Sequence, residues 1–374
     1  MPKRILFVVN HAGFFLSHRL PIAQAAREAG YDVHVATPKS KHVSRIMDAG
    51  LPWHEIYLSR SGRNPFAEAR TLAHLIRLYR RLGPDLVHHV TSKPVMYGTI
   101  AARLARVPAV VNAVSGTGHL FVPGGAARRV QRSLLGMLYR LSQRHSRMRV
   151  IFQNKEQLHD FTARGWMRSS DAVLIPGSGV DIEAFQPTFS ERNVPVVALA
   201  SRMLFSKGVV EFVRAARLLR ERRVAARFIL LGEPDPDNPD SIPAEQLRQW
   251  SSDGLVEAPG RVEDMPAAFA GIDILTLPTY YGEGVPRVLV EAAACGIPAV
   301  TTDWPGCRDI VRAEETGILI PARDVTRLAD ALQRLIENPE LRRQMGSRAR
   351  LAVKDFSLPV VIQKTLAIYR ELIG

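Results

Sequence analysis

The sequence predicts an α/β protein built from two doubly wound parallel sheets. Apolar stretches of strand length alternate with amphipathic stretches of helical length, and the alternation begins near residue 4 and restarts near residue 194. Strands separated by helices favour parallel sheets with right-handed crossovers. A chain of 374 residues is also too long for one ordinary core, so two domains are expected.

In the first half, short apolar runs predict strands at 4–9, 32–37, 85–90 and 109–114. Helices are expected between them at 17–29, 66–81 and 96–105, with Gly30 just past the end of the first. The second half predicts strands at 194–200, 228–231, 272–277 and 299–301, and helices at 209–223 and 358–373. The expected domains are 1–185 and 186–357, followed by a C-terminal helical segment, 358–374.

Composition excludes several classes of protein. The hydrophobic fraction of 46% is that of a soluble globular protein, and no apolar run approaches the roughly 18 residues that cross a bilayer. The apolar run after the N-terminal basic residues is shorter than a signal peptide requires. The two cysteines, Cys295 and Cys307, lie in no metal-ligand pattern, which favours reduced thiols in the cytoplasm.

The net charge of +14 is unevenly distributed. Residues 1–190 hold 26 Lys+Arg against 11 Asp+Glu, whereas residues 191–374 hold 24 against 25. A strongly basic first half beside a neutral second half points to an anionic partner for the first half, either a membrane surface or a nucleic acid.

The most informative stretch follows the strand expected at 272–277 and sets Glu283 and Glu291 eight residues apart. Gly282 and Gly284 suit a turn, and Pro286 suits the first position of a helix. If the span is fully helical, the two glutamates lie about 12 Å apart, one at the start of the helix and one buried further along it.

Between these glutamates, the exposed N–H groups of Gly284 and Val285 would form a phosphate site at the start of the helix. Hydroxyl-binding groups on both sides of a diphosphate site suit a nucleotide-sugar. The alternative is a surface glutamate and a helical glutamate with no shared task, since glutamate is ordinary in a first helical turn.

This segment resembles the E-x7-E element of the retaining glycosyltransferases of family 4, which have the GT-B fold, with two Rossmann-like domains facing across a cleft. The run from Arg202 to Lys207 and Gly208 resembles the R-x4-K-G donor loop of that family. Residues 259–262 resemble the turn that holds the base, and residues 176–187 the interdomain signature, with Ser-Gly replacing the common Asn-Gly. The resemblance covers nearly the whole chain and is most specific in the second half.

The resemblance implies roles for the donor-binding residues. Arg202 and Lys207 would stabilise the departing diphosphate electrostatically, while Arg261 and Val262 would lie at the base. Glu283 would contact sugar hydroxyls, and Glu291 would accept hydrogen bonds from the ribose. The family needs no divalent metal, so cations come from side chains. It retains the anomeric configuration, and the wide glutamate spacing disfavours a glycosidase mechanism.

Two loops of the first half are candidate ligand sites. Gly13, assigned to donor binding, would let a ligand approach the backbone, and one glycine is too few for a dinucleotide fingerprint. His18, expected at the start of a helix and assigned to catalysis and acceptor binding, begins a segment that resembles the H-x-R-x-P stretch of members acting on lipid-linked sugars, although histidine there also suits capping or packing. After the strand at 109–114 come Ser115, Gly116 and His119, near the place where many relatives carry a sugar-contacting histidine.

A cationic amphipathic helix is expected near residues 124–147. Residues 101–150 contain nine arginines and no acidic residue. Such a helix can lie in an anionic membrane interface, and the alternative is an apolar stripe that faces the core beneath solvated arginines. The residues assigned to the membrane are Arg128, Arg129, Arg132, Leu134 and Leu138.

These expectations combine into one functional hypothesis. The protein would be a metal-independent retaining glycosyltransferase, peripheral on the inner face of the cell membrane, that moves an N-acetylhexosamine from a UDP-sugar to an undecaprenyl-diphosphate-linked saccharide. Two alternatives stay open: another nucleotide-sugar or a soluble acceptor, and a catalytically silent membrane scaffold. Nucleic acid is the weaker partner, because no aromatic platform or binding motif is present.

Overall fold

The computed structural model describes residues 1–58, 65–114, 136–187, 192–236, 238–282 and 284–374. It divides into two compact units, Met1–Gly179 with Leu358–Gly374, and Val180–Ser357. The division comes before the expected boundary after residue 185. The reason is that Val180 already pairs with Ser357, and Phe185 packs in the core of the second unit.

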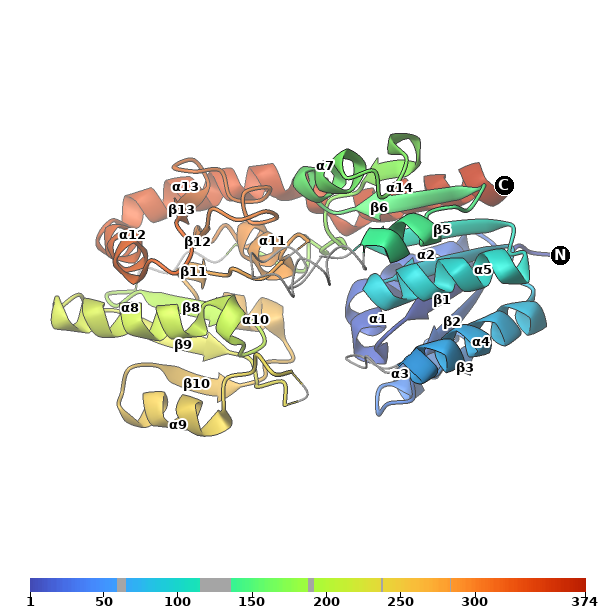
Figure 1. The fold of residues 1–374 in the computed structure, drawn as a ribbon. Helices are drawn as coiled ribbons and strands as arrows, with labels where there is room; N and C mark the ends of the chain where they lie inside the picture. The colour runs from blue at the N-terminus through green and yellow to red at the C-terminus, as the bar shows by residue number, and fades with distance from the viewer. Residues whose placement is uncertain (59–64, 115–135, 188–191, 237, 283) are drawn as a thin grey trace. The chain divides into compact units, whose positions relative to one another are not determined.

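The first unit contains a seven-stranded parallel sheet in the order β3-β2-β1-β4-β5-β6-β7 (Figure 1). Its strands are β1 (Arg4–Val9), β2 (Asp32–Thr37), β3 (Trp53–Glu55), β4 (Leu86–Val90), β5 (Ala109–Val114), β6 (Met148–Phe152) and β7 (Ala172–Leu174). The chain runs outward from β1 through β2 and β3, then returns to the other side of β1 with β4. This reversal is the mark of a doubly wound sheet.

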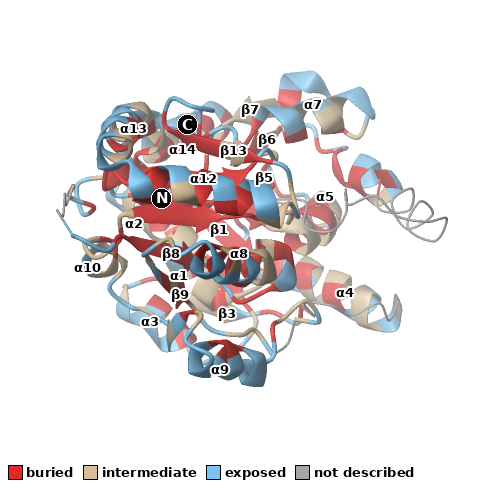
Figure 2. Cartoon of the chain, turned by 90° about the vertical axis from the view of Figure 1, so that its left-hand side faces the viewer, coloured by how far each residue is buried: buried red, intermediate tan, exposed pale blue. Residues whose placement is uncertain are grey.

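Alternate residues of β1 build two cores on the two faces of this sheet. Phe7 faces a core completed by α2 (Leu20–Glu28) and α14 (Leu358–Ile373), whereas Leu6 faces a core completed by α4 (Pro65–Leu82) and α5 (Thr99–Ala105). Figure 2 shows the strands buried and the helices exposed on their outer sides. A strand buried on both faces reads as a continuous apolar run, which is why the sequence identifies it.

The helix predicted over 17–29 is two helices, α1 (Ala12–His18) and α2, which break at Arg19. Pro21 supplies no N–H and restricts the backbone before it, so one continuous helix cannot form there. The helix predicted over 96–105 begins with a π-helix, η1 (Pro94–Gly98), before α5. The unit also contains α3 (Val43–Asp48), α7 (Lys155–Ala163) and η3 (Ser169–Asp171).

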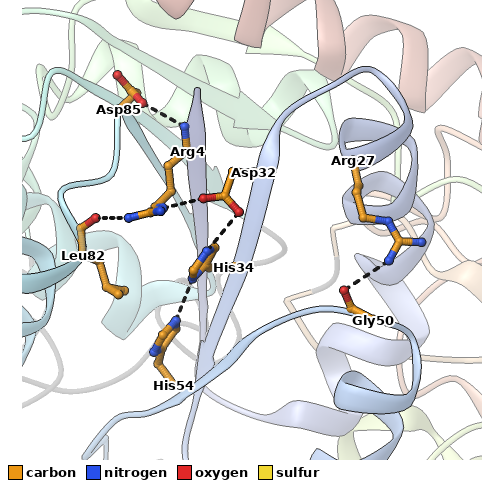
Figure 3. A network of polar contacts seen from close by, with 8 residues as sticks. All are labelled: Arg4, Arg27, Asp32, His34, Gly50, His54, Leu82 and Asp85. Atoms are coloured by element: carbon orange, nitrogen blue, oxygen red, sulfur yellow. Dashed lines mark hydrogen bonds and ion pairs between the residues drawn. The ribbon is translucent and has the colours of Figure 1, made fainter. Parts of the chain in front are cut away.

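Charged groups at the amino edge of the first sheet are paired with one another (Figure 3). Arg4 Nε donates to Asp32 Oδ2 at 2.7 Å, and the Arg4 backbone N–H donates to Asp85 Oδ2 at 2.8 Å. His34 lies between Asp32 and His54, with ring nitrogens 3.1 Å and 2.8 Å from them. The carboxylates of β2 and of the turn before β4 are therefore neutralised at this edge.

The second unit contains a six-stranded parallel sheet in the order β10-β9-β8-β11-β12-β13. Its strands are β8 (Val196–Ala200), β9 (Arg227–Leu231), β10 (Glu257–Gly260), β11 (Ile274–Leu277), β12 (Ala299–Thr302) and β13 (Gly317–Ile320). Its helices are η4 (Phe205–Lys207), α8 (Val209–Glu221), α9 (Ala244–Ser252), α10 (Met265–Phe269), α11 (Arg287–Ala294), α12 (Val325–Glu337), α13 (Pro339–Ala352) and η5 (Val353–Phe356). Alternate residues of β8 again face two cores, Leu199 on one side and Ala198 on the other. The predicted α/β class is confirmed in both units.

Candidate active site

The loops that carry the predicted donor motifs meet at one edge of the second sheet, because the carboxyl ends of parallel strands lie together. The order of the strands reverses between β8 and β11, and ligands of doubly wound sheets bind at such a reversal. The loop after β8 carries Arg202 and Lys207, and the chain after β11 leads to Glu291.

The loop after β8 turns sharply at Gly208, where φ is 78°. A β-carbon on Gly208 would lie 2.3 Å from the carbonyl oxygen of Pro278, which follows β11. Only glycine fits this left-handed turn against another backbone. The close approach of two strand ends therefore explains the glycine that follows Lys207.

Two carboxylates of the loop after β9 hold the turn in place. The Ser206 N–H donates to Asp240 Oδ2 at 3.1 Å, and the Phe205 N–H donates to the Asp240 carbonyl oxygen at 2.8 Å. Arg202 Nη1 lies 2.8 Å from Asp235 Oδ2. This acidic loop thus orients the segment with both cations.

Aromatic rings after β11 contact the cations at this edge. Lys207 Nζ lies 5.3 Å from the centre of the Tyr281 ring, and Arg323 Cζ lies 4.2 Å from the centre of the Tyr280 ring. The faces of aromatic rings attract cations. The Tyr280 N–H donates to the Ser206 carbonyl oxygen at 2.9 Å, which ties this segment to the Lys207 loop.

Glu291 lies inside α11 and is 7% exposed. Arg287 Nε donates to Glu291 Oε1 at 2.7 Å. Burial raises the pKa of Glu291, and Arg287 opposes part of the rise. The sequence identifies the buried carboxylate but misses its partner, although an arginine four residues earlier on one helix is a recognisable pairing signal.

The start of α11 differs from the prediction. Pro286 is the N-cap with extended backbone, and the helix begins at Arg287. The span between the two glutamates is therefore not fully helical, and the estimated separation does not apply. Gly284 and Val285 precede the helix and are buried, because Val285 packs in the core. Glu283 lies outside the described residues.

Residues 259–262, predicted as a turn, instead begin as the end of β10. Gly260 is the last strand residue with φ of 90°, and Arg261 Nη1 lies 3.5 Å from Glu233 Oε1. Val262 is half-buried and packs against the core. A cavity of about 520 Å³ opens beside this strand end. Its lining includes Gly232, Glu233, Ala244, Leu247, Arg248 and Gly260.

Glu211, in the first turn of α8, is a second shielded carboxylate of this unit, and the sequence does not single it out. Its Oε2 has no hydrogen-bond partner among the described residues. Burial raises the pKa of Glu211, while Arg323 and Arg214 lower it. No sequence signal distinguishes it from an ordinary acidic residue of a first helical turn.

In the first unit, His18 is the last residue of α1, not the first residue of a helix as predicted. The helix begins earlier because the ring of His11 caps it, accepting from the Phe14 N–H at 3.3 Å. His18 stacks on Phe14 with ring centres 4.1 Å apart. A β-carbon on Gly13 would meet the ring of His11 at 2.9 Å, so a side chain already covers this glycine.

Several predicted site residues lie outside the described residues, namely Ser115, Gly116, His119, Arg128, Arg129, Arg132 and Leu134. Leu138 is half-buried and packs against the core of the first unit, so at this position the stripe faces the core and not a membrane. Its neighbours Met137 and Leu141 are exposed. In the part of the chain that the structure describes, no cluster of His, Cys, Asp or Glu could hold a metal ion, and no helix is long and apolar enough to cross a membrane.

Each unit matches one family of glycosyltransferases. Residues 4–154 match the family described as glycosyl transferase 4-like, and residues 194–338 match the family described as glycosyl transferases group 1. The chain belongs to these families and is a glycosyltransferase. The glycosyltransferase expectation is thereby confirmed, and the silent scaffold is set aside.

Individual relatives and solved structures show which glycosyltransferases the chain is similar to. The chain is 26% identical to the N,N'-diacetylbacillosaminyl-diphospho-undecaprenol alpha-1,3-N-acetylgalactosaminyltransferase of Campylobacter jejuni, over 98% of each chain. It is 23% identical to the UDP-Gal:alpha-D-GlcNAc-diphosphoundecaprenol alpha-1,3-galactosyltransferase of Escherichia coli, over 82% of this chain and 80% of that one. Its fold matches HepE of Anabaena in complex with UDP, with a TM-score of 0.78 and 19% identity over 99% and 100% of the chains. The fold is GT-B, as expected.

Proposed function

We propose that this enzyme transfers an N-acetylhexosamine from a UDP-sugar to an undecaprenyl-diphosphate-linked saccharide, with retention of configuration and without a metal ion. The observation that carries the proposal is the edge of the second sheet, where Arg202 and Lys207 lie on the loop beside the segment that leads to Glu291. A buried carboxylate and two cations at a strand-order reversal suit a ribose and a diphosphate.

The departing diphosphate carries the charge that develops as the sugar leaves. Arg202 offers a planar fork that matches phosphate oxygens, and Lys207 a compact charge. Both are held before any ligand arrives, Arg202 by Asp235 and Lys207 by the Tyr281 ring. Cations fixed in advance stabilise a developing anion without reorganisation.

Glu291 would accept hydrogen bonds from the ribose hydroxyls. Its pKa is raised by burial, so added donors favour the ionised carboxylate that binds them best. The acceptor hydroxyl would attack the face that the diphosphate leaves, with the departing phosphate as base. This route needs no nucleophile from the enzyme.

The acceptor and donor classes rest on the relatives. Two of them, from Campylobacter jejuni and Escherichia coli, are named for acceptors linked to diphospho-undecaprenol, and the second is named for a UDP-sugar. Because these alignments cover most of each protein, they support the same reaction class for this chain. Neither relative fixes the sugar, because fold and family do not determine specificity.

Membrane association would bring the enzyme to a lipid-linked acceptor. The exposed arginines Arg103, Arg106, Arg140 and Arg144 accompany the exposed apolar residues Leu104 and Met137. Arg140 and Arg144 line a cavity of about 420 Å³, large enough for a lipid phosphate. We place the protein peripherally on the inner face of the cell membrane. A variant with Arg140→Glu and Arg144→Glu should no longer co-sediment with anionic liposomes. The same result is expected of a variant in which Arg128, Arg129 and Arg132 are replaced by glutamate.

A panel of nucleotide-sugars tests the proposed reaction against an undecaprenyl-diphosphate saccharide and a soluble saccharide. Product NMR reports the anomeric configuration, and one arm contains EDTA. Transfer from a UDP-N-acetylhexosamine to the lipid acceptor, with retention and no loss in EDTA, is the expected result. Transfer only from another nucleotide-sugar, or only to the soluble acceptor, would favour the alternative enzyme.

A further inference from the structure

The carboxyl edge of the first sheet carries positive charge. The described segments that follow β1, β2 and β4, residues 10–18 (with α1), 38–42 and 91–93, contain three lysines and three histidines and no acidic residue. At the opposite edge, Asp32 and Asp85 are paired with Arg4 (Figure 3). Charge is thus separated along the strands, and the edge where doubly wound sheets bind ligands suits an anion.

The order of the strands reverses between β1 and β4, so the expected ligand crevice lies outside their carboxyl ends. Val9 is directly opposite Val90 in this strand pair. Asn10 and Thr91 therefore begin neighbouring loops, and the turn after β4 lies beside the crevice.

This turn has an unusual backbone. Thr91 has φ of 74°, which is a strained value for a β-branched residue. Two hydrogen bonds hold it there, from the Thr91 N–H to the Ala113 carbonyl oxygen at 3.3 Å and from the Val95 N–H to the Thr91 carbonyl oxygen at 3.0 Å. The π-helix η1 then begins at Pro94, and π-helical turns are frequent at functional sites.

A buried polar network supports the turn from below. His89 Nδ1 donates to Asn112 Oδ1 at 2.8 Å, so its Nε2 accepts from the Tyr79 hydroxyl at 3.0 Å. The Thr99 hydroxyl donates to the carbonyl oxygen of Val95 in the π-helix at 2.6 Å and lies 3.1 Å from Asn112 Oδ1. A buried hydrogen-bond network of this kind is rigid, which fixes the position of the turn above it.

Glycine is required where the π-helix crosses this network. A β-carbon on Gly98 would lie 2.4 Å from the ring of His89. The first helical turn therefore packs directly on the imidazole, and the residues before it, Ser92 and Lys93, are held at the sheet edge.

Lys93 is the charged group of the turn. Its Nζ lies 2.5 Å from Glu68 Oε1 on α4, and the two side chains are 19% and 15% exposed. Glu68 also accepts from Tyr97, and burial together with this carboxylate raises the pKa of that tyrosine. Keeping the charge of a lysine largely out of water costs free energy. A shielded ionisable side chain at the edge where ligands bind is therefore a candidate functional group.

We propose that the turn after β4 binds the diphosphate group of the lipid-linked acceptor, with Lys93 as the contacting cation and Glu68 as the residue that positions it. This inference rests on the proposed function, since the acceptor supplies the diphosphate. Lys39 and Lys41, on the loop after β2, add to the positive charge of the same edge.

A binding titration tests the inference without turnover. Geranyl diphosphate is titrated into the full-length protein in saturating UDP, which occupies the donor site. Lys93→Met should weaken binding about ten- to a hundredfold, the loss of one charge-assisted contact, and Lys93→Arg should restore most of it. Glu68→Gln should tighten binding, because its amide oxygen can still accept from Lys93 and position it, while a carboxylate near the diphosphate is removed. Lys3→Met, which breaks the Lys3–Asp85 pair at the other edge, is the matched control and should bind like wild type.

Other results would overturn the inference. The wild type would not bind geranyl diphosphate, or Lys93→Met would bind it with the affinity of the wild type. Weaker binding by Glu68→Gln would also contradict the inference, because it is the result expected of a purely structural ion pair. In the transfer assay, Lys93→Met should raise the KM for the acceptor and leave the KM for the donor unchanged. If the wild type uses no lipid-linked acceptor, the proposed function fails, while the titration still decides whether Lys93 binds a diphosphate.

Discussion

Replacement of Gly208 by alanine should strongly destabilise the second unit. At φ of 78°, an alanine costs about 1–2 kcal/mol relative to glycine. Its β-carbon would also lie 2.3 Å from the Pro278 carbonyl oxygen, a backbone atom that cannot rotate away. Relief of such a clash by backbone movement adds about 1–3 kcal/mol.

The expected total of about 2–5 kcal/mol corresponds to a fall in Tm of roughly 5–15 °C for a unit of this size. Calorimetry of Gly208→Ala measures it, with Gly254→Ala as the control. Gly254 has φ of 66°, but its nearest neighbour, Arg220 Nη1, would lie 3.8 Å from the new β-carbon. The control therefore reports the cost of the backbone angle alone.

The same substitution should weaken donor binding, because Lys207 adjoins Gly208 and moves with it. A titration of UDP into each folded variant should show a loss for Gly208→Ala and none for Gly254→Ala. If the two variants melt within about 2 °C of each other, less than the 1 kcal/mol difference expected, the contact with Pro278 does not constrain the loop. The explanation of this glycine is then wrong.

Three further predictions concern charges. Arg287→Met should destabilise the second unit by about 1–2 kcal/mol at pH 7, and by less at pH 4, because burial raises the pKa of Glu291 and so favours its neutral form. Urea unfolding at both pH values checks this, and Glu291→Gln in the same chain should recover stability. Burial lowers the pKa of His89 to about 4. As the pH falls from 6.5 to 4, this histidine therefore binds a proton in the unfolded chain before it does so in the folded chain, and the free energy of unfolding falls by up to about 3 kcal/mol. Melting curves of His89→Gln should depend less on pH. Asp235→Asn should change stability by less than about 1 kcal/mol yet raise the KM for the donor, because Arg202 loses its orienting partner.

Most central strands could be predicted from the sequence because burial on both faces makes them continuous apolar runs, but the central strand β6 was not predicted. β1, β2 and β5 begin and end where expected. The edge strand β3 is three residues long, and β10 contains Pro259 and Gly260, so length and residue type do not distinguish these two strands from loops. The break at Arg19 was missed although Pro21 signals it, because the apolar periodicity continues through it.

The candidate site, like the fold, could be predicted only in part. The motifs locate the cation-bearing loop and the buried Glu291, since each is defined by neighbouring residues. Their partners come from distant loops, as when Asp240 holds Ser206 and Arg323 lies over Tyr280. Such pairs depend on which strand ends are adjacent in the sheet. A single sequence does not specify that order.

The position of α14 has a consequence for synthesis on the ribosome. Tyr369 and Leu372 belong to the core of the first unit, yet they are translated after every residue of the second unit. Residues 180–357 are contiguous and can fold as soon as they emerge, whereas the earlier-made sheet stays without α14 until residues 358–373 have also been made. The half of the molecule that is made first is thus completed last, and a nascent chain has an open apolar surface that a chaperone could shield.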